Sequence, residues 1–216
     1  MSIANLEEIK CPCGEAFEAE LLSAISISDN PELKEALISG EINLVCCPAC
    51  GDMFHAERFI LYHDSENELI AFVYPLSFQS QAAQCRKRMQ HDFKTAIEKF
   101  DEKNKIGYEP IMFFGIEDLA LLLRTEQEIE DEESVLEYTA QEISLDLIKI
   151  SPSFARKLNI PKVLPVPKNE KKYNEKAITA LKTLTKHNSN LLNYAKLLEK
   201  LSENKNLIEE INKKVK

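Results

Sequence analysis

The segment NLVCCPACGDMFHAE, residues 43–57, repeats a pattern that the chain has already used in IKCPCGEAFEAE, residues 9–20. In each segment a Cys-Gly pair is followed by two residues, a phenylalanine and then x-Ala-Glu. A glycine directly after a cysteine allows the left-handed backbone of a tight turn. The repeat therefore predicts two similar turns, each presenting a pair of thiols.

Paired thiols on two tight turns are typical of a structural zinc site, in which four soft ligands form a tetrahedron. Cys47 and Cys50 have the C-x2-C-G spacing of such a turn, whereas one residue separates Cys11 from Cys13. We therefore predict that Cys11, Cys13, Cys47 and Cys50 bind Zn²⁺. Cys46 is an alternative ligand or an extra thiol, because adjacent residues of a strand point to opposite faces.

The remaining reactive side chains have simpler interpretations. His55 and His63 lie near the second turn, where a lone histidine is more commonly a surface or hydrogen-bonding residue than a ligand. Cys85 lies on the apolar face of a predicted helix and is interpreted as a small core residue.

Four thiolates leave zinc no open position for water, and the chain lacks the usual hydrolase, nucleotide and metalloprotease motifs. We therefore expect no enzymatic activity.

Composition sets the protein class. The chain has 216 residues, of which 44% are hydrophobic and 29% charged, so a packed core is expected. No apolar run approaches the roughly 18 residues of a membrane span, and the first residues lack the apolar core of a signal peptide. These features predict a cytoplasmic protein, in which paired cysteines more commonly bind metal than form disulfides.

The pattern of apolar residues predicts an α+β fold. Residues 1–76 are expected to form a small antiparallel, zinc-ribbon-like β region, with a helix inserted between the two cysteine turns and ended by Gly40. Residues 77–150 are expected to be a mostly helical extension: a helix over 77–105, one further strand, and two helices divided by an acidic turn within 116–150. Together they would form one domain.

The last third of the chain has a different composition. Four prolines within residues 151–168 predict an extended linker. Residues 169–216 are expected to form a basic helical tail. Its apolar residues over 190–215 follow a roughly heptad-like spacing, which fits an oligomerisation arm or an amphipathic helix that packs on its own protein. The basic side chains bind nucleic acid in one interpretation and dock on the acidic body in the other, which the acidity of residues 1–75 favours.

The segments CPCGEAF and ISISDNPELKEALISGEINLVCCPACGDMFHAERFILYHD closely resemble the CpXC domain family of prokaryotic proteins. The resemblance covers roughly residues 9–130 and is weaker toward EPIMFFGIEDLALLL. It places the ligand positions of the family on Cys11, Cys13, Cys47 and Cys50, and implies a metal site without implying an activity. This chain departs from the family pattern by having one residue fewer in its first cysteine element.

Three functions fit these features. We expect a non-enzymatic protein with structural zinc that binds a protein partner. The first alternative is a nucleic-acid-associated adaptor that uses the basic tail, although a chain without tryptophan offers few stacking platforms. The second alternative is a thiol redox protein that uses its closely spaced cysteines.

Overall fold

The computed structural model describes residues 1–98, 106–204 and 206–215. It divides into two compact units, Met1–Arg124 and Thr125–Lys216, and the boundary lies inside one helix, α3 (Ile116–Glu142). No helix among the described residues has the length and apolar character needed to cross a membrane. The structure thus divides the chain at a different place from the expected boundaries at 150 and 168.

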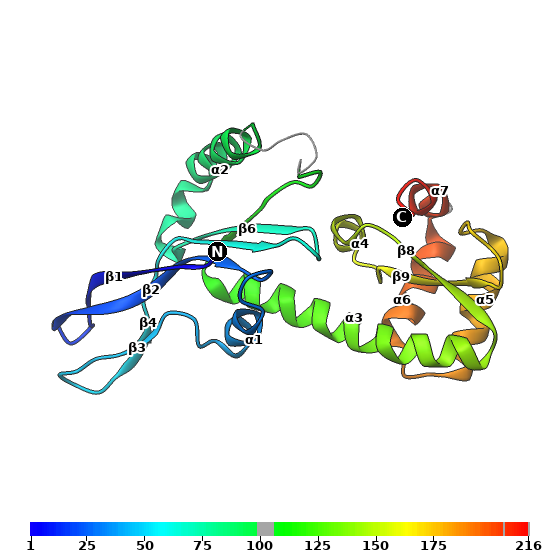
Figure 1. Cartoon of the computed structure of the whole chain (residues 1–216), viewed down its shortest axis with the longest axis horizontal. Helices are drawn as coiled ribbons and strands as arrows, with labels where there is room; N and C mark the ends of the chain where they lie inside the picture. The colour runs from blue at the N-terminus through cyan, green and yellow to red at the C-terminus, as the bar shows by residue number, and fades with distance from the viewer. Residues whose placement is uncertain (99–105, 205, 216) are drawn as a thin grey trace. The chain divides into compact units, whose positions relative to one another are not determined.

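A five-stranded mixed sheet forms the first unit (Figure 1). Its strands, in spatial order, are β1 (Ile3–Lys10), β2 (Ala16–Ser26), β5 (Ile60–Asp64), β6 (Leu69–Tyr74) and β7 (Ile111–Phe114). The β1–β2 and β5–β6 pairs are antiparallel, whereas the β2–β5 and β6–β7 pairs are parallel. The mixed α and β content agrees with the predicted class, but the sheet is larger than expected and not purely antiparallel.

The parallel pairs explain why helices separate these strands. Parallel neighbours need a crossover connection, which cannot be a short hairpin. The crossover from β2 to β5 contains α1 (Glu32–Ser39) and the small hairpin of β3 (Leu44–Cys46) and β4 (Met53–His55). The crossover from β6 to β7 contains a 3-10 turn, η1 (Leu76–Gln81), and α2 (Ala82–Ile97). The expected helix is confirmed over α2, and its continuation over 99–105 lies outside the described residues.

The inner strand β6 is buried along its whole length, so alternate residues enter two different cores. Leu69, Ala71 and Val73 pack with α1 and the beginning of α3. On the other face the next residues along the strand pack with Cys85 and Met89 of α2. The sheet therefore has a helix layer on each side, as Figure 1 shows.

The second unit contains a two-stranded antiparallel sheet, β8 (Leu145–Lys149) and β9 (Val163–Pro167), surrounded by helices. These helices are α4 (Pro152–Leu158), α5 (Glu175–His187), α6 (Leu192–Glu203) and α7 (Leu207–Asn212), together with the second half of α3. The expected linker is therefore structured, as α4 and β9. Prolines are tolerated there because Pro152 lies in the first turn of α4, and Pro165 and Pro167 lie on a strand of a two-stranded sheet.

The C-terminal helices pack onto their own unit. Their apolar residues, including Leu181, Tyr194, Leu197, Leu201 and Ile211, are buried in one core with β9. This arrangement matches the interpretation of an amphipathic helix packed on its own protein, and it leaves the heptad-like face of 190–215 inside the unit.

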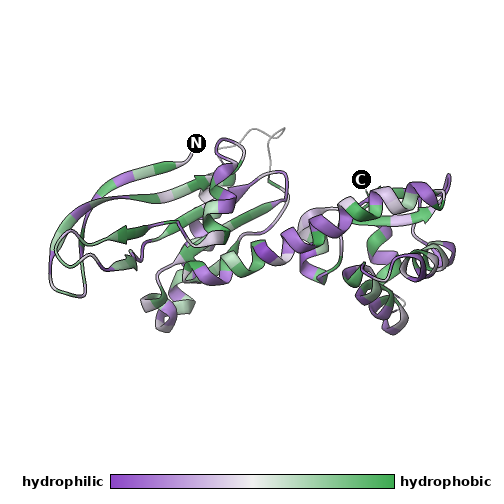
Figure 2. Cartoon of the chain, turned by 90° about the horizontal axis from the view of Figure 1, so that it is seen from below, coloured by the Kyte–Doolittle hydropathy of each residue, from purple (hydrophilic) through white to green (hydrophobic). Residues whose placement is uncertain are grey.

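The acidic stretch of 116–150 is also different from the prediction. It is part of one continuous helix, α3, along which hydrophilic and hydrophobic residues alternate (Figure 2). Its carboxylates meet basic partners of the same unit: Glu126 pairs with Arg156, and Glu130 lies 2.7 Å from Lys162 Nζ. The residues after α3, expected to be helical, form β8 because they pair with β9.

Asn43 connects the small hairpin to the main sheet. Its side chain accepts a hydrogen bond from Leu22 N–H at 2.8 Å and donates one to Leu22 C=O at 3.0 Å, as a neighbouring strand would do. It is 9% exposed and has a φ of 55°, a region in which asparagine is enriched. We expect Asn43→Ala to destabilise the first unit by about 1–3 kcal/mol because two buried backbone groups lose their partner.

Two variants of this experiment separate the causes. Asn43→Gly relieves the backbone strain but not the lost hydrogen bonds, so it should be destabilised less than the alanine variant. Asn5→Ala removes an exposed side-chain bond to Ser23 and should change the unfolding free energy by less than about 0.5 kcal/mol. Equal midpoints for Asn43→Ala and wild type in chemical denaturation would contradict this role.

Glu133 is a buried carboxylate in the second unit, 6% exposed. It accepts hydrogen bonds from the backbone N–H groups of Lys162 and Val163 at 2.9 and 3.2 Å. Burial raises the pKa of Glu133 above its ordinary value of 4.5, although the charge of Lys162 opposes the shift. Glu133→Gln keeps an acceptor and should be nearly neutral at pH 7, whereas Glu133→Ala should cost about 1–3 kcal/mol because two buried donors lose their acceptor.

The raised pKa also predicts the sign of a pH effect. The folded state binds the proton of Glu133 more tightly than the unfolded state, so acidification toward pH 4.5 stabilises wild type relative to Glu133→Gln. Denaturation of both proteins between pH 7 and pH 4.5 measures this difference. A difference that stays constant, or changes in the opposite direction, would show that the pKa is not raised.

Candidate metal centre

The first cysteine turn joins β1 to β2 and is closed by two backbone hydrogen bonds. Cys11 N–H donates to Glu15 C=O at 2.8 Å, and Gly14 N–H donates to Cys11 C=O at 2.9 Å. Gly14 has a φ of 103°, in the region that favours glycine. The strand pair β1–β2 therefore ends in a tight turn that carries Cys11 and Cys13.

The second cysteine turn joins β3 to β4 and has the same two bonds. Cys47 N–H donates to Asp52 C=O, and Gly51 N–H donates to Cys47 C=O, both at 2.9 Å. Gly51 has a φ of 77°. In both turns the first cysteine bonds to the glycine and to the residue after it. The shorter first element closes the same pair of bonds with one residue fewer.

The two turns meet through equivalent residues of the repeat. Phe17 and Phe54 each lie three positions after the turn glycine, and their rings make an edge-to-face contact with centroids 6.3 Å apart. Ile9 and Val45 each lie two positions before the first cysteine, and both are buried in the same small core. The repeat therefore builds two similar halves of one hydrophobic contact, which brings the turns together.

The four predicted cysteines come together at this contact. The Sγ atoms of Cys11, Cys13, Cys47 and Cys50 all lie within 4.8 Å of one another, a spacing that could hold a metal ion. The Cys11 and Cys50 sulfurs are 3.7 Å apart, and those of Cys13 and Cys47 are 3.8 Å apart. Each of these close pairs takes one sulfur from each turn.

The burial and hydrogen bonds of the sulfurs are uneven. Cys11 and Cys47 are buried, whereas Cys13 and Cys50 are exposed. The Cys13 N–H group donates to Cys11 Sγ at 3.4 Å, so the first turn directs an amide at its own thiol. The cluster therefore has one protected side and one side that solvent reaches.

The close thiols also shift one another's proton affinity. The backbone N–H of Cys50 is the main group that lowers the pKa of Cys47, to about 7. For Cys50, the N–H of Asp52 lowers the pKa, but burial and the three neighbouring thiols together raise it to about 12. The lower pKa of Cys47 means that its thiol ionises more readily than the Cys50 thiol. A divalent cation bound by these thiols would lower the pKa of each ligating sulfur, because it stabilises the thiolate form.

The other candidates lie outside the cluster. Cys46 is exposed on β3, where its thiol faces the backbone carbonyls of Cys47 and Gly51 at 3.9 and 3.6 Å. His55 Nδ1 lies 3.4 Å from Ile42 C=O. His63 Nε2 lies 3.2 Å from the Tyr108 hydroxyl, and burial lowers the pKa of this histidine.

Cys85 is buried on α2 among apolar side chains, as predicted. Asp64, next to His63, accepts hydrogen bonds from the backbone and side chain of Asn67 and closes the β5–β6 hairpin. The Asp64 carboxylate therefore has a structural role in the hairpin turn.

Asn43, Ile9 and Val45 were not identified from the sequence as part of this centre. Asn43 leaves only a weak signal, because a single asparagine before a strand is common. Ile9 and Val45 did leave a signal, since both occur at the same distance from the repeated Cys-Pro pair. Extending the repeat toward the N-terminal side would have identified them.

Comparisons with known proteins agree with the cysteine pattern. No curated protein and no solved structure matches the chain. A family model described as CpXC protein matches residues 9–141, which is more than half of the chain and includes all four clustered cysteines. By this match and its two cysteine turns, the chain belongs to the CpXC protein family.

Proposed function

We propose that Cys11, Cys13, Cys47 and Cys50 bind one structural zinc ion, and that the protein acts by binding a protein partner rather than by catalysis. The observation that carries the proposal is the spacing of the four sulfurs. A Zn–S distance of about 2.3 Å gives a tetrahedron with edges of about 3.8 Å. The two short S–S distances of 3.7 and 3.8 Å fit this edge.

The donor set also favours zinc. Four thiolates bind soft or borderline metals, chiefly zinc, copper(I) and the iron of iron–sulfur clusters, better than they bind magnesium or calcium. Zinc has no redox change and accepts the tetrahedron without strain. With all four positions taken by sulfur, the ion has no site for a substrate or an activated water, which supports a structural role.

The structural role follows from the small size of the local core. Among the described residues, the core where the two turns meet has four buried apolar side chains, Ile9, Leu21, Val45 and Ala56. A core of this size stabilises little by itself, and the free energy of binding structural zinc becomes folding free energy. The proposal therefore gives the ion the task of holding the β3–β4 hairpin against β1 and β2.

Several contacts in the second unit weigh against the nucleic-acid alternative. In the second unit Arg156 and Lys162 pair with carboxylates of α3. Lys200 Nζ donates to the backbone carbonyls of Leu158 and Asn159 at 2.9 and 2.7 Å. These three cations are engaged within the unit, which lowers the charge available for phosphate. The proposal keeps the cytoplasmic location, where cysteines such as these stay reduced.

The direct test measures metal. Purified wild-type protein should contain one zinc per chain by elemental mass spectrometry, and Cys47→Ser should lose it. Removing a coordinating thiolate should weaken binding by more than the roughly 10- to 100-fold of an outer-shell change. Cys46→Ser is the matched control, because it removes a neighbouring exposed thiol that lies outside the cluster. Folded wild-type protein without bound metal would overturn the proposal, as would full zinc in Cys47→Ser.

Thiol reactivity separates the structural role from a redox role. In the native protein we expect one fast-reacting thiol, the exposed Cys46, and loss of this phase in Cys46→Ser. The four clustered thiols should react slowly until a chelator is added, because metal-bound thiolates are protected. Several fast thiols without chelator, with a reactivity that changes after mild oxidation, would instead favour the redox alternative.

A further inference from the structure

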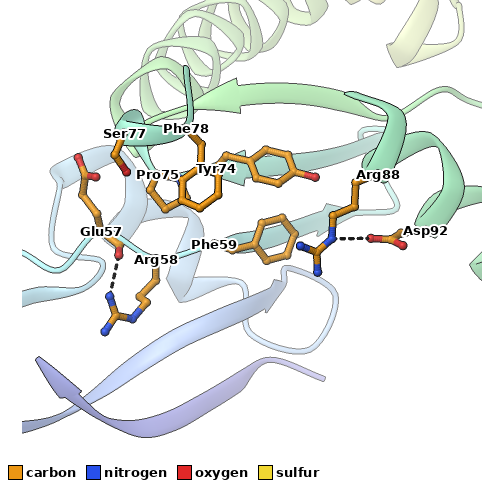
Figure 3. A pocket seen from close by; sticks show the side chains of 9 residues that line it. All are labelled: Glu57, Arg58, Phe59, Tyr74, Pro75, Ser77, Phe78, Arg88 and Asp92. Atoms are coloured by element: carbon orange, nitrogen blue, oxygen red, sulfur yellow. Dashed lines mark hydrogen bonds and ion pairs between the residues drawn. The ribbon is translucent and has the colours of Figure 1, made fainter. Parts of the chain in front are cut away.

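The first unit also contains a cavity, which is formed by residues other than the four clustered cysteines. Its volume is about 480 Å³, within the range of small-molecule sites. Phe59 before β5, Tyr74 at the end of β6, Phe78 of η1 and Arg88 of α2 contribute to its walls (Figure 3). The cavity is therefore bounded by the sheet and by the crossover that follows β6.

The walls of this cavity are largely aromatic. The rings of Phe59 and Tyr74 lie 5.2 Å apart between centroids. Tyr74 is held in place from α2, because its hydroxyl donates to Cys85 C=O at 3.3 Å. Phe59 and Phe78 are 38% and 42% exposed, so part of each ring is accessible to a ligand. The fixed ring and the two exposed rings together offer a preformed surface for a flat apolar body.

Two arginines line the cavity, but they differ in how their donors are used. Arg58 pairs with Glu7 and donates to the backbone carbonyls of Glu57 and Glu8 at 3.0 and 3.4 Å. Its guanidinium group is thus engaged on the side of β1. The proposed ligand therefore has to find its charged partner elsewhere.

Arg88 has donors to spare. The structure gives it one ion pair within the described residues, from Nε to Asp92 at 3.6 Å, and its side chain is 77% exposed. An exposed pair of this kind, four residues apart on a helix, contributes little to stability. Figure 3 shows the Arg88 guanidinium beside the Phe59 ring, with Glu57 at the opposite end of the cavity. Each end of the cavity thus has one arginine and one carboxylate, Arg88 with Asp92 and Arg58 with Glu57, and the terminal nitrogens of Arg88 make no ion pair among the described residues.

We propose that this cavity binds a planar aromatic carboxylate. The aromatic body would lie against Phe59, Tyr74 and Phe78, and the carboxylate would accept hydrogen bonds from the terminal nitrogens of Arg88. Planar guanidinium and carboxylate groups suit each other because two parallel hydrogen bonds form at once. The Arg88 end is favoured for the carboxylate because the guanidinium of Arg58, at the other end, is already engaged.

The charge of the ligand is tested with three matched probes. These are 2-naphthoate, neutral 2-naphthalenemethanol and cationic 2-naphthylmethylamine, added to the full-length, metal-loaded protein. Their fluorescence is measured directly, because the chain has no tryptophan. We expect naphthoate to bind at least about 10-fold more tightly than the alcohol, and the amine to bind most weakly.

Three variants locate the binding. Arg88→Gln should weaken naphthoate binding at least about 10-fold and leave the alcohol unchanged, because only the carboxylate loses its partner. Asp92→Asn should retain or strengthen naphthoate binding, because it frees Arg88 from its only ion pair among the described residues. Arg86→Gln is the matched control: it removes the same charge from an exposed position of α2 that does not line the cavity.

Other outcomes overturn the proposal. Tighter binding of the amine, weakened further by Asp92→Asn, would identify a cation site instead. Equal effects of Arg86→Gln and Arg88→Gln would show a general charge effect of α2. Absence of naphthoate binding at millimolar concentration would remove the site. Zinc content and thermal unfolding of each variant are measured in parallel, so a folding defect or a failure of the metal proposal is seen separately.

Discussion

Contact between the two cysteine turns is the constraint on which the N-terminal part of the first unit depends. Each turn closes with its own backbone hydrogen bonds, yet neither carries enough sulfur for a tetrahedral site. The Phe17–Phe54 contact and the small core beside it bring the two pairs of thiols within 4.8 Å. Four ionised thiolates at this distance would repel one another, so a bound cation would stabilise the arrangement.

The sequence predicted this centre well because its signals are local. The Cys-Gly spacing and the phenylalanine three residues later act over a few residues, and the structure agrees with both. Parallel pairing of β2 with β5 was not predictable in this way, since it joins segments more than thirty residues apart. Tertiary contacts decide such pairs, and the alternation of one strand carries no information about its neighbour.

The C-terminal third shows how tertiary packing overrides composition. Proline content predicted an extended linker, but Val163, Leu164 and Val166 are almost fully buried and hold β9 in a core. Similarly, an acidic turn was expected to divide the segment that forms α3 into two helices. Arg156 and Lys162 neutralise part of its charge, so the helix continues. The two basic partners of α3 lie 30 and 32 residues away in sequence from the carboxylates that they pair with.

The shorter first turn also shows which part of the motif is variable in length. In both turns the first cysteine forms backbone hydrogen bonds with the glycine and with the residue after it, whatever the number of residues between the two cysteines. A residue gained or lost between two ligands is therefore absorbed inside the turn, and Phe17 and Phe54 keep their positions. An insertion after the glycine would instead move every following side chain to the other face of its strand. The turn glycine thus fixes the positions of the residues that follow it, whereas the number of residues between the two cysteine ligands can vary.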